Sequence, residues 1–460
     1  MTWRFPVARL VGRLIRFLAQ TLGLGGTSLP GRVILGIDPD FIKHTIRQFD
    51  LVILITGTNG KTTTANLVAE ILRRHGDEVI HNREGANMLS GIATALLDRP
   101  RRKSGRSVAV LEVDEGNLDL LCQHLKPSAV VVTNLLRDQL DRYWELQRLW
   151  QVIHDCLLSL PEATLILNAD DSLVASLGYG HQRVQYYGVN QKPEQKSSII
   201  EPREAHFCPL CEAPLRFEYF QYSHLGQYAC TACAYTRPEP NYCVISYYIQ
   251  AGTTSFKLRH PTGALSLTTF LLGFYNIYNV TAAVSLALSF NVPSATITAV
   301  VEDFLPPEGR SEVFYLRGKR CTLFLTKNPS GLTEVLKTIN PKTTLGFLFA
   351  INDLAADGRD VSWLWDVDYT HLNEHPTFPI VCAGLRAGDM ALCLKYNGID
   401  PKRIKIQENR LKSILELLNE PVDELAILCT YTNLAPYRKL LCKLGDKHET
   451  IHLPSVSRSA

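Results

Sequence analysis

The stretch that decides the fold is Leu51–Gly76, LVILITGTNGKTTTANLVAEILRRHG. Its first part, Leu51–Thr56, is an almost wholly apolar run rich in β-branched residues, which predicts a buried strand of a parallel sheet. The last part predicts a helix, because its apolar residues fall on one helical face: Leu67, Val68, Ile71 and Leu72. A strand, a glycine turn and a helix in this order are typical of an α/β domain that binds phosphate groups.

The turn between the expected strand and helix is Gly57–Thr62, GTNGKT. Its glycines allow backbone N–H groups to close around phosphates, and the N-terminus of the helix adds positive potential. In such a loop Lys61 reaches the β- and γ-phosphates, and the Thr62 hydroxyl binds magnesium. The sequence therefore predicts an ATP-type site.

This loop is a shortened variant, because Ile55 stands where the general eight-residue pattern has a glycine. A glycine-rich turn without a ligand is the alternative, but Gly-Lys-Thr between a strand and a helix favours nucleotide binding. The residues expected to contact the nucleotide are Gly57, Thr58, Asn59, Gly60, Lys61, Thr62 and Thr63.

Length and composition limit the class of protein. With 460 residues, the chain is long enough for two or three domains, each with its own core. Charged residues make up 20% and hydrophobic residues 46%, as in ordinary globular proteins. The net charge of +3 is too small to indicate a nucleic-acid partner. No apolar run is long enough to span a bilayer.

Residues 1–50 are expected to form an N-terminal helical segment. A first helix would place arginines near one face (Arg9, Arg13 and Arg16) and large apolar residues near another (Leu10, Leu14 and Phe17). Such a helix either packs on the body of the protein or rests on an anionic membrane surface. We favour packing, because amphipathic helices of this kind are common in globular chains.

Carboxylates follow the next apolar run, Ser107–Leu111. Ligands bind at the carboxyl ends of parallel strands in open α/β sheets, and magnesium needs a carboxylate beside the phosphates. Glu112 is the first candidate, with Asp114 and Glu115 behind it; a charged turn without a metal is the alternative. Further strand and helix patterns follow up to residue 171, which predicts a doubly wound, mostly parallel sheet.

Two polar segments of this region remain ambiguous on sequence grounds. Arg83 lies in a loop-like stretch where it would either meet an anion or face solvent, and solvent is slightly favoured. Asp138 and Asp141, in a helical pattern, would face either the metal or solvent.

Four of the 12 cysteines are grouped, as C-x2-C-x18-C-x2-C: Cys208, Cys211, Cys230 and Cys233. Two such pairs at this spacing predict a tetrahedral four-thiolate zinc site, and the alternating pattern between them predicts a zinc ribbon inserted at about residues 203–240. Because no coordination position remains open, the zinc should be structural. Four unrelated thiols are the alternative. A metal site with otherwise scattered cysteines favours a reducing compartment, hence the cytoplasm.

Three features beyond the ribbon complete the pattern. Asn276 and Asn279 lie three residues apart at a helix start, where their amides would either sandwich a flat ring such as adenine or cap the helix. A linker ending at Arg310 separates residues 51–309, the expected ATP-binding domain, from residues 310–460, an expected Rossmann-like α/β domain. In that last domain Asp357 and Asp360 lie in a polar loop after a strand, which predicts a binding or catalytic loop.

Together these motifs resemble the Mur ligase family, and most closely its MurT members, the ligase subunits of lipid II isoglutaminyl synthases. Family-wide motifs are the loop at Gly57–Thr62, Glu112, the Asn276/Asn279 segment and Arg310. Narrower motifs are NREGANM from Asn82, the four-cysteine ribbon and ADGRDVSWLWD from Ala356.

The resemblance implies an ATP-dependent carbon–nitrogen ligase of peptidoglycan synthesis, and hence of cell wall biogenesis and cell shape. In such ligases ATP phosphorylates a carboxylate and an amine attacks the acyl phosphate, a reaction that requires positioning and charge neutralisation. The implied roles are phosphate and magnesium binding for Lys61 and Thr62 and magnesium binding for Glu112. Asn276 and Asn279 would lie by the adenine, and Arg310 would contact the nucleotide.

The MurT resemblance further implies amidation of the α-carboxylate of D-glutamate in the lipid II stem peptide to D-isoglutamine, with glutamine as nitrogen donor. Ammonia would come from a GatD-type glutamine amidotransferase subunit in a heterodimer. An aspartate of the C-terminal domain would complete the Cys–His pair of that partner; Asp357 and Asp360 both match. A lipid-linked substrate would place the protein in the cytoplasm, peripherally at the inner face of the membrane.

Two departures from the wider family bear on the substrate. No lysine occurs between Lys126 and Lys192, so the carbamylated lysine of many Mur ligases looks absent. About fifty residues precede the phosphate loop, too few for a UDP-recognising domain.

Two other functions are considered: a stand-alone Mur-like amino-acid ligase, and a catalytically silent ATP-binding scaffold. The intact Lys61, Thr62 and Glu112 disfavour the scaffold.

Overall fold

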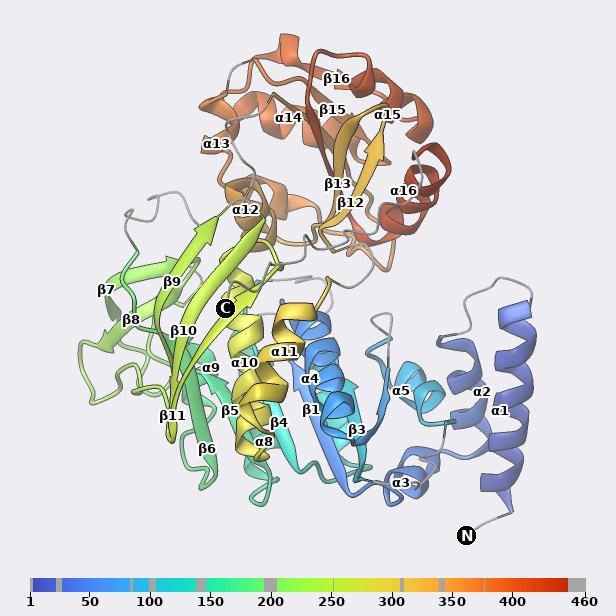
Figure 1. Cartoon of the computed structure of the whole chain (residues 1–460), viewed down its shortest axis with the longest axis vertical. Helices are drawn as coiled ribbons and strands as arrows, with labels where there is room; N and C mark the ends of the chain where they lie inside the picture. The colour runs from blue at the N-terminus through green and yellow to red at the C-terminus, as the bar shows by residue number, and fades with distance from the viewer. Residues whose placement is uncertain are drawn as a thin grey trace, which may run out of the picture. The chain divides into compact units, whose positions relative to one another are not determined.

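The structure is a computed structural model that describes residues 3–21, 27–82, 86–98, 105–137, 146–193, 205–250, 252–306, 310–338, 344–375 and 377–445. The chain divides into two compact units, one extending to Leu305 and the other beginning at Pro306 (Figure 1). The expected sites at Arg83, Asp138 and Asp141 lie outside the described residues.

The first unit is built on a nine-stranded sheet with the order β11-β10-β9-β6-β5-β4-β1-β3-β2. Its strands are β1 (Leu51–Thr56), β2 (Glu78–His81), β3 (Ser107–Glu112), β4 (Ala129–Val132), β5 (Thr164–Asn168), β6 (Val184–Val189), β9 (Tyr242–Gln250), β10 (Thr253–His260) and β11 (Gly263–Thr269). The pairings from β2 through β9 are parallel, and β9, β10 and β11 pair antiparallel. The expected parallel α/β sheet is therefore confirmed.

Helices cover both faces of this sheet (Figure 1). The helices of this unit are α1 (Arg4–Thr21), α2 (Leu29–Ile37), α3 (Phe41–Ile46), α4 (Lys61–His75), α5 (Leu89–Ala95), α6 (Leu118–Cys122), α8 (Leu146–Leu158), α9 (Ser172–Ser176), α10 (Tyr275–Ser289) and α11 (Ser294–Asp303), with the 3-10 turn η1 (Glu115–Asn117). Along β1, Ile53 and Ile55 join one core with α4, α10 and α11, whereas Val52 and Leu54 join the other core. The continuous apolar run thus reflects burial on both faces.

Helix α4 begins at the lysine of the phosphate loop and ends where the sequence indicates. Gly76 adopts a left-handed conformation with φ of 102°, and its N–H donates to the carbonyls of Arg73 and Leu72. Glycine adopts this conformation without steric cost, so it terminates the helix.

A two-stranded antiparallel ribbon is inserted between β6 and β9, which are neighbours in the sheet although the ribbon separates them in sequence. Its strands are β7 (Leu215–Tyr222) and β8 (Leu225–Cys230). The two cysteine pairs lie at the open end of this hairpin, next to the bridges Phe207–Pro214 and Ala229–Thr236.

The second unit contains a six-stranded sheet with the order β12-β13-β17-β14-β15-β16. The strands are β12 (Glu312–Leu316), β13 (Lys319–Leu325), β14 (Leu345–Ala350), β15 (Ile380–Ala383), β16 (Ile404–Ile406) and β17 (Glu424–Cys429). The helices are α12 (Pro329–Thr338), α13 (Thr370–Asn373), α14 (Ala387–Tyr396), α15 (Arg410–Leu418) and α16 (Tyr431–Leu444), with the 3-10 turns η2 (Ser362–Asp366) and η3 (Pro401–Arg403). All pairings except the β12–β13 hairpin are parallel, and a core lies on each face, which confirms the expected C-terminal α/β domain.

Candidate active site and four-cysteine cluster

The loop between β1 and α4 requires glycine at two positions. Gly57 and Gly60 have φ angles of 122° and 84°, which disfavour other residues. A Cβ atom at Gly57 would also lie 2.3 Å from Thr133 Oγ1, and one at Gly60 would lie 1.9 Å from Asn279 Oδ1. The tight loop is therefore set by close neighbours as well as by backbone conformation.

Neighbouring strands hold the loop from outside. The N–H of Asn59 donates to Asn134 Oδ1 at 2.8 Å, and its carbonyl accepts from Thr133 Oγ1 at 2.7 Å. Thr133 and Asn134 follow β4, so the end of one parallel strand fixes the loop at the end of the next. The sequence indicates only that Thr133 and Asn134 follow an apolar strand pattern, Ala129–Val132.

The ammonium group of Lys61 lies inside the loop. Lys61 Nζ donates to the carbonyls of Gly57 and Thr58, and it lies 2.8 Å from Glu115 Oε2. Burial alone would lower the pKa of Lys61, but the attraction of the neighbouring carboxylates, Glu115 first, outweighs it and raises that pKa. Lys61 is therefore a fixed cation at neutral pH.

Glu112 is held rigidly at the end of β3. The Asn82 side chain accepts from the Glu112 N–H and donates to the Glu112 carbonyl, both at 2.8 Å. Glu112 Oε1 accepts from Thr62 Oγ1 at 3.1 Å and from Asn87 Nδ2 at 3.4 Å. Asn82 and Asn87 thus position the carboxylate, a role that their place in a polar loop did not reveal.

The second oxygen of Glu112 meets the requirements of a metal ligand. Among the described residues, Oε2 is buried and accepts no hydrogen bond. Buried carboxylate oxygens are rarely left without a partner, because desolvation is costly. A carboxylate oxygen beside a threonine hydroxyl at a phosphate loop suits magnesium, so the residues fit this ion.

Asn276 and Asn279, at the start of α10, lie against the same loop. Asn279 Nδ2 donates to Asn276 Oδ1 at 2.9 Å, and Asn276 Nδ2 donates to the Leu272 carbonyl at 2.6 Å. The Asn279 amide borders Gly60, since a Cβ atom at Gly60 would overlap Asn279 Oδ1. The structure therefore brings Lys61, Thr62, Glu112 and the two asparagines together.

The other predicted site residues belong to the second unit. Arg310 is half-buried at its start. Asp357 is buried, and its carboxylate accepts from the N–H and hydroxyl of Thr432 at 2.7 and 2.6 Å. Asp360 is exposed and accepts from the N–H and hydroxyl of Ser362 at 2.8 and 2.9 Å. The two aspartates are therefore not equivalent: one holds its loop, and the other faces solvent.

The four cysteines gather in one cluster, with all four sulfur atoms within 4.8 Å of one another. The N–H groups of Ala232 and Cys233 each lie 3.4 Å from Cys230 Sγ and donate to it. These donors, the Ala232 N–H first, lower the pKa of the Cys230 thiol to about 6, which favours the thiolate that binds metal. The donor set fits a closed, structural zinc site.

Asp170 fastens the ribbon to the sheet. Its carboxylate accepts from Arg237 Nε at 2.6 Å, from the Tyr278 hydroxyl at 2.6 Å and from the Val189 N–H at 2.9 Å. Its carbonyl accepts from the Gly226 N–H of the ribbon at 2.8 Å. Desolvation would lower the pKa of Arg237, but its attraction to Asp170 raises it, so the guanidinium stays charged.

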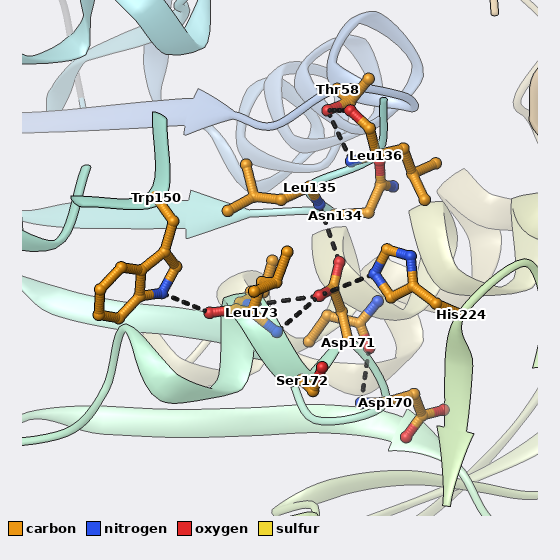
Figure 2. Close-up of polar contacts among 12 residues, drawn as sticks. Thr58, Asn134, Leu135, Leu136, Trp150, Asp170, Asp171, Ser172, Leu173 and His224 are labelled. Carbon is orange, nitrogen blue, oxygen red and sulfur yellow. Dashed lines mark hydrogen bonds and ion pairs between the residues drawn. The ribbon is translucent and has the colours of Figure 1, made fainter. Parts of the chain in front are cut away.

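The neighbouring Asp171 connects the ribbon to the phosphate loop, as Figure 2 shows. His224, in the turn between β7 and β8, is fully buried with Nε2 3.2 Å from Asp171 Oδ1. Asp171 Oδ2 accepts from the Leu135 N–H at 2.8 Å. The next N–H, of Leu136, donates to Thr58 Oγ1 at 2.9 Å. The sequence indicates only that Asp171 follows an apolar strand pattern, Thr164–Leu167, which does not predict these contacts.

The family model "Mur ligase middle domain" matches residues 55–231, and the model "MurT ligase C-terminal" matches residues 325–434. The chain is 32% identical to the lipid II isoglutaminyl synthase (glutamine-hydrolyzing) subunit MurT of Streptococcus pneumoniae, over 96% of this chain and 98% of that protein. This chain belongs to the MurT family of Mur ligases.

A further relative and a solved structure agree with this assignment. The Staphylococcus aureus (strain COL) protein of the same name is 30% identical over 93% of this chain and 95% of that protein. The pseudomurein peptide ligase type C from Methanothermus fervidus has the same fold, with a TM-score of 0.68 and 22% identity over 85% of this chain and 78% of that one. The expected family and ligase class are confirmed, and Mur ligases use ATP and magnesium.

The two family models divide the MurT chain between its units. The middle-domain model spans the phosphate loop, Glu112 and three of the four cysteines, whereas the C-terminal model spans Asp357 and Asp360. In the part of the chain that is described, no helix is long and apolar enough to cross a membrane.

Proposed function

We propose that this MurT family chain is the ligase subunit that amidates the α-carboxylate of D-glutamate in the lipid II stem peptide, giving D-isoglutamine for peptidoglycan synthesis. The observation that carries the proposal is the rigid placement of Lys61, Thr62 and Glu112 at one phosphate loop. The names of the two relatives, which cover nearly the whole chain, supply the substrate.

In the proposed reaction, a carboxylate oxygen of the substrate attacks the γ-phosphorus of ATP, giving an acyl phosphate and ADP. Ammonia then attacks the acyl carbon, phosphate leaves with the C–O bond electrons, and the surplus proton passes to solvent. Lys61 neutralises charge on the transferred phosphoryl group by exchanging Glu115 for phosphate oxygens. Its rigid surroundings reduce the reorganisation that the transition state requires.

Magnesium would be held by the Thr62 hydroxyl and by Glu112 Oε2, where it would supply charge neutralisation and orientation of the phosphates. Asn82 and Asn87 keep that carboxylate in place. Asn279 would lie by the nucleotide, beside Gly60, with Asn276 supporting it. Zinc would be held by the four thiolates, and it would stabilise the ribbon without entering the reaction.

We further propose that ammonia comes from a GatD-type glutaminase subunit. Of the two candidate aspartates, Asp360 is better placed to reach a histidine of a partner, because its side chain is exposed whereas Asp357 is buried. An aspartate beside a catalytic histidine orients the ring and stabilises its charged form.

The test of this function compares two nitrogen sources with the reconstituted complex. Asp360→Asn should lose glutamine-dependent amidation of lipid II and retain amidation with ammonium, whereas Lys61→Ala should lose both. Lys126→Ala, an exposed lysine on a loop before β4, is the matched control and should retain both. Equal loss of both activities in Asp360→Asn would place that residue in the ligase reaction. Turnover of a free amino acid by the isolated chain would favour the stand-alone ligase.

Because lipid II is membrane-bound, the proposed function also places the protein at the inner face of the cytoplasmic membrane.

A further inference from the structure

Helix α1 packs on the rest of the first unit through three small residues and through the side chains of Phe5 and Arg9. Its buried residues are Phe5, Ala8, Arg9, Gly12 and Ala19. A Cβ atom at Gly12 would lie 2.5 Å from Ile34 Cδ1, so α1 and α2 approach closely. Arg9 Nη2 donates to the Leu97 carbonyl at 3.1 Å, which places this arginine inside the unit.

Apart from the buried Phe5, large apolar residues of α1 and the preceding Trp3 face outward. They form one stripe along the helix: Trp3, Val7, Leu10, Leu14, Phe17 and Leu18. Trp3 and Leu10 are 73% and 72% exposed, and Leu14 and Phe17 are 58% and 62% exposed. Scattered apolar residues on a surface need no explanation, but a continuous stripe along one helix indicates an interaction site.

The charges of α1 are all positive. The helix contains four arginines and no acidic residue. Arg9 is buried, and Arg16 pairs with Asp98 at 2.7 Å. Arg4 and Arg13 are exposed, and Arg13 Nη2 also donates to the Leu97 carbonyl at 3.5 Å. An apolar stripe beside exposed arginines, with a tryptophan at one end, is typical of a helix that lies in the plane of a membrane interface.

The same helix lines a cavity that extends to Asn82, a residue that supports the candidate active site. A cavity of about 360 Å³ is lined by Arg16 and Gln20 of α1 and by His81, Asn82 and Gly91 of the sheet edge and α5. Asn82 is the residue that binds the backbone of Glu112. In Figure 1 α1 is the outermost helix of this end of the unit, beyond α2 and α5. One face of α1 is therefore turned to solvent while the other adjoins the surroundings of Glu112.

We propose that the outward face of α1 is a docking surface for anionic lipid bilayers. The stripe inserts into the interface, and Arg4 and Arg13 bind lipid phosphates. This inference rests on the proposed function, because a membrane-bound substrate would then be presented to the site while its lipid remains in the bilayer. A protein partner is less suited, because it would have to cover a face that combines large apolar side chains with arginines.

The test is co-sedimentation of the full-length protein with vesicles that contain phosphatidylglycerol or only phosphatidylcholine. We expect binding to the anionic vesicles that weakens as salt is raised, and little binding to the neutral ones. The double variant Leu10→Glu/Leu14→Glu should reduce vesicle binding at least tenfold. Because each basic residue near an anionic surface contributes roughly a fivefold gain in binding, Arg4→Glu/Arg13→Glu should also bind much more weakly.

The control is Leu120→Glu/Leu158→Glu, which changes two other exposed leucines, on α6 and α8, and should bind as the native protein does. Circular dichroism and melting temperature check that each variant folds. Equal vesicle binding by the native protein and the α1 variants would overturn the inference. So would a native dimer that the α1 variants abolish, since the face would then bind a second copy.

A second measurement separates this inference from the proposed function. Amidation of detergent-solubilised lipid II needs no bilayer, so the Leu10→Glu/Leu14→Glu variant should retain it. Amidation without vesicle binding by the native protein would refute only the docking surface. Vesicle binding without amidation would refute only the proposed function.

Discussion

The ion pair between Asp170 and Arg237 predicts a large cost when only one partner is removed. Both side chains are buried, and the carboxylate also accepts hydrogen bonds from Tyr278 and Val189. Asp170→Asn leaves the guanidinium buried without its counter-ion. Breaking such a pair from one side costs about 3–5 kcal/mol of unfolding free energy.

This loss of unfolding free energy should appear as a decrease in the melting temperature. For domains of somewhat smaller size, each kcal/mol shifts the midpoint by about 2–4 °C. We therefore expect the midpoint temperature at which the first unit unfolds to be about 6–20 °C lower in Asp170→Asn, as measured by calorimetry at saturating zinc. Glu218→Gln is the control, because the exposed ion pair of Glu218, on the ribbon, with Lys192, after β6, should contribute little.

The double variant Asp170→Asn/Arg237→Gln tests the physical reasoning. Removing both charges leaves no uncompensated ion, so the double variant should lose less stability than the sum of the two single variants. If Asp170→Asn lowers the unfolding free energy by less than about 1 kcal/mol, the ion pair does not fasten the ribbon to the sheet and the reasoning fails. Additive losses would show that the two charges act independently.

Three further outcomes are expected. Glu112→Gln should lower the rate of ADP release about 100-fold at limiting magnesium, because a ligand is lost; an unchanged rate would remove Glu112 from the metal site. Cys230→Ser should lower both the zinc content and the melting temperature, and zinc-free native protein by metal analysis would contradict the ribbon assignment. Asp77 is buried, which raises its pKa, but hydrogen bonds from Arg106 and His75 outweigh burial and lower that pKa. The ionised Asp77 carboxylate should thus stabilise the fold above pH 3.8, its unfolded-state pKa. This stabilisation should be lost as the pH falls through the lower folded-state pKa. The melting-temperature gap between native protein and Asp77→Asn should stay constant from neutral pH to about 5 and close in stronger acid; a gap that widens there would refute this.

Local patterns predicted much of the fold and part of the site. The strand, loop and helix around Lys61 were predictable because adjacent residues in sequence form all three elements. The four cysteines were predictable because two short spacings bring each pair together without knowledge of the rest of the fold. Glu112 could be placed because parallel strands end at one edge of the sheet.

Contacts between distant segments were not predictable. Nothing in the sequence couples Lys61 to Glu115 or Glu112 to Asn82, because these pairs depend on strand order. The same holds for His224, a single histidine in a turn that becomes buried only when the ribbon folds back on Asp171. Periodicity gave α1 two faces but not their orientation: the helix packs through Phe5, Arg9 and small residues, whereas most of its large apolar residues face outward.

The central claim is that this chain transfers ammonia to a lipid-linked carboxylate at the expense of ATP. The most direct measurement is mass spectrometry of the stem peptide after incubation of lipid II, ATP, magnesium and glutamine with this chain and a GatD-type glutaminase. The account predicts conversion of the D-glutamate α-carboxylate to a carboxamide, with one ADP formed per amide and neither product formed by Lys61→Ala. An unmodified peptide, or a peptide extended by an amino acid, would contradict it.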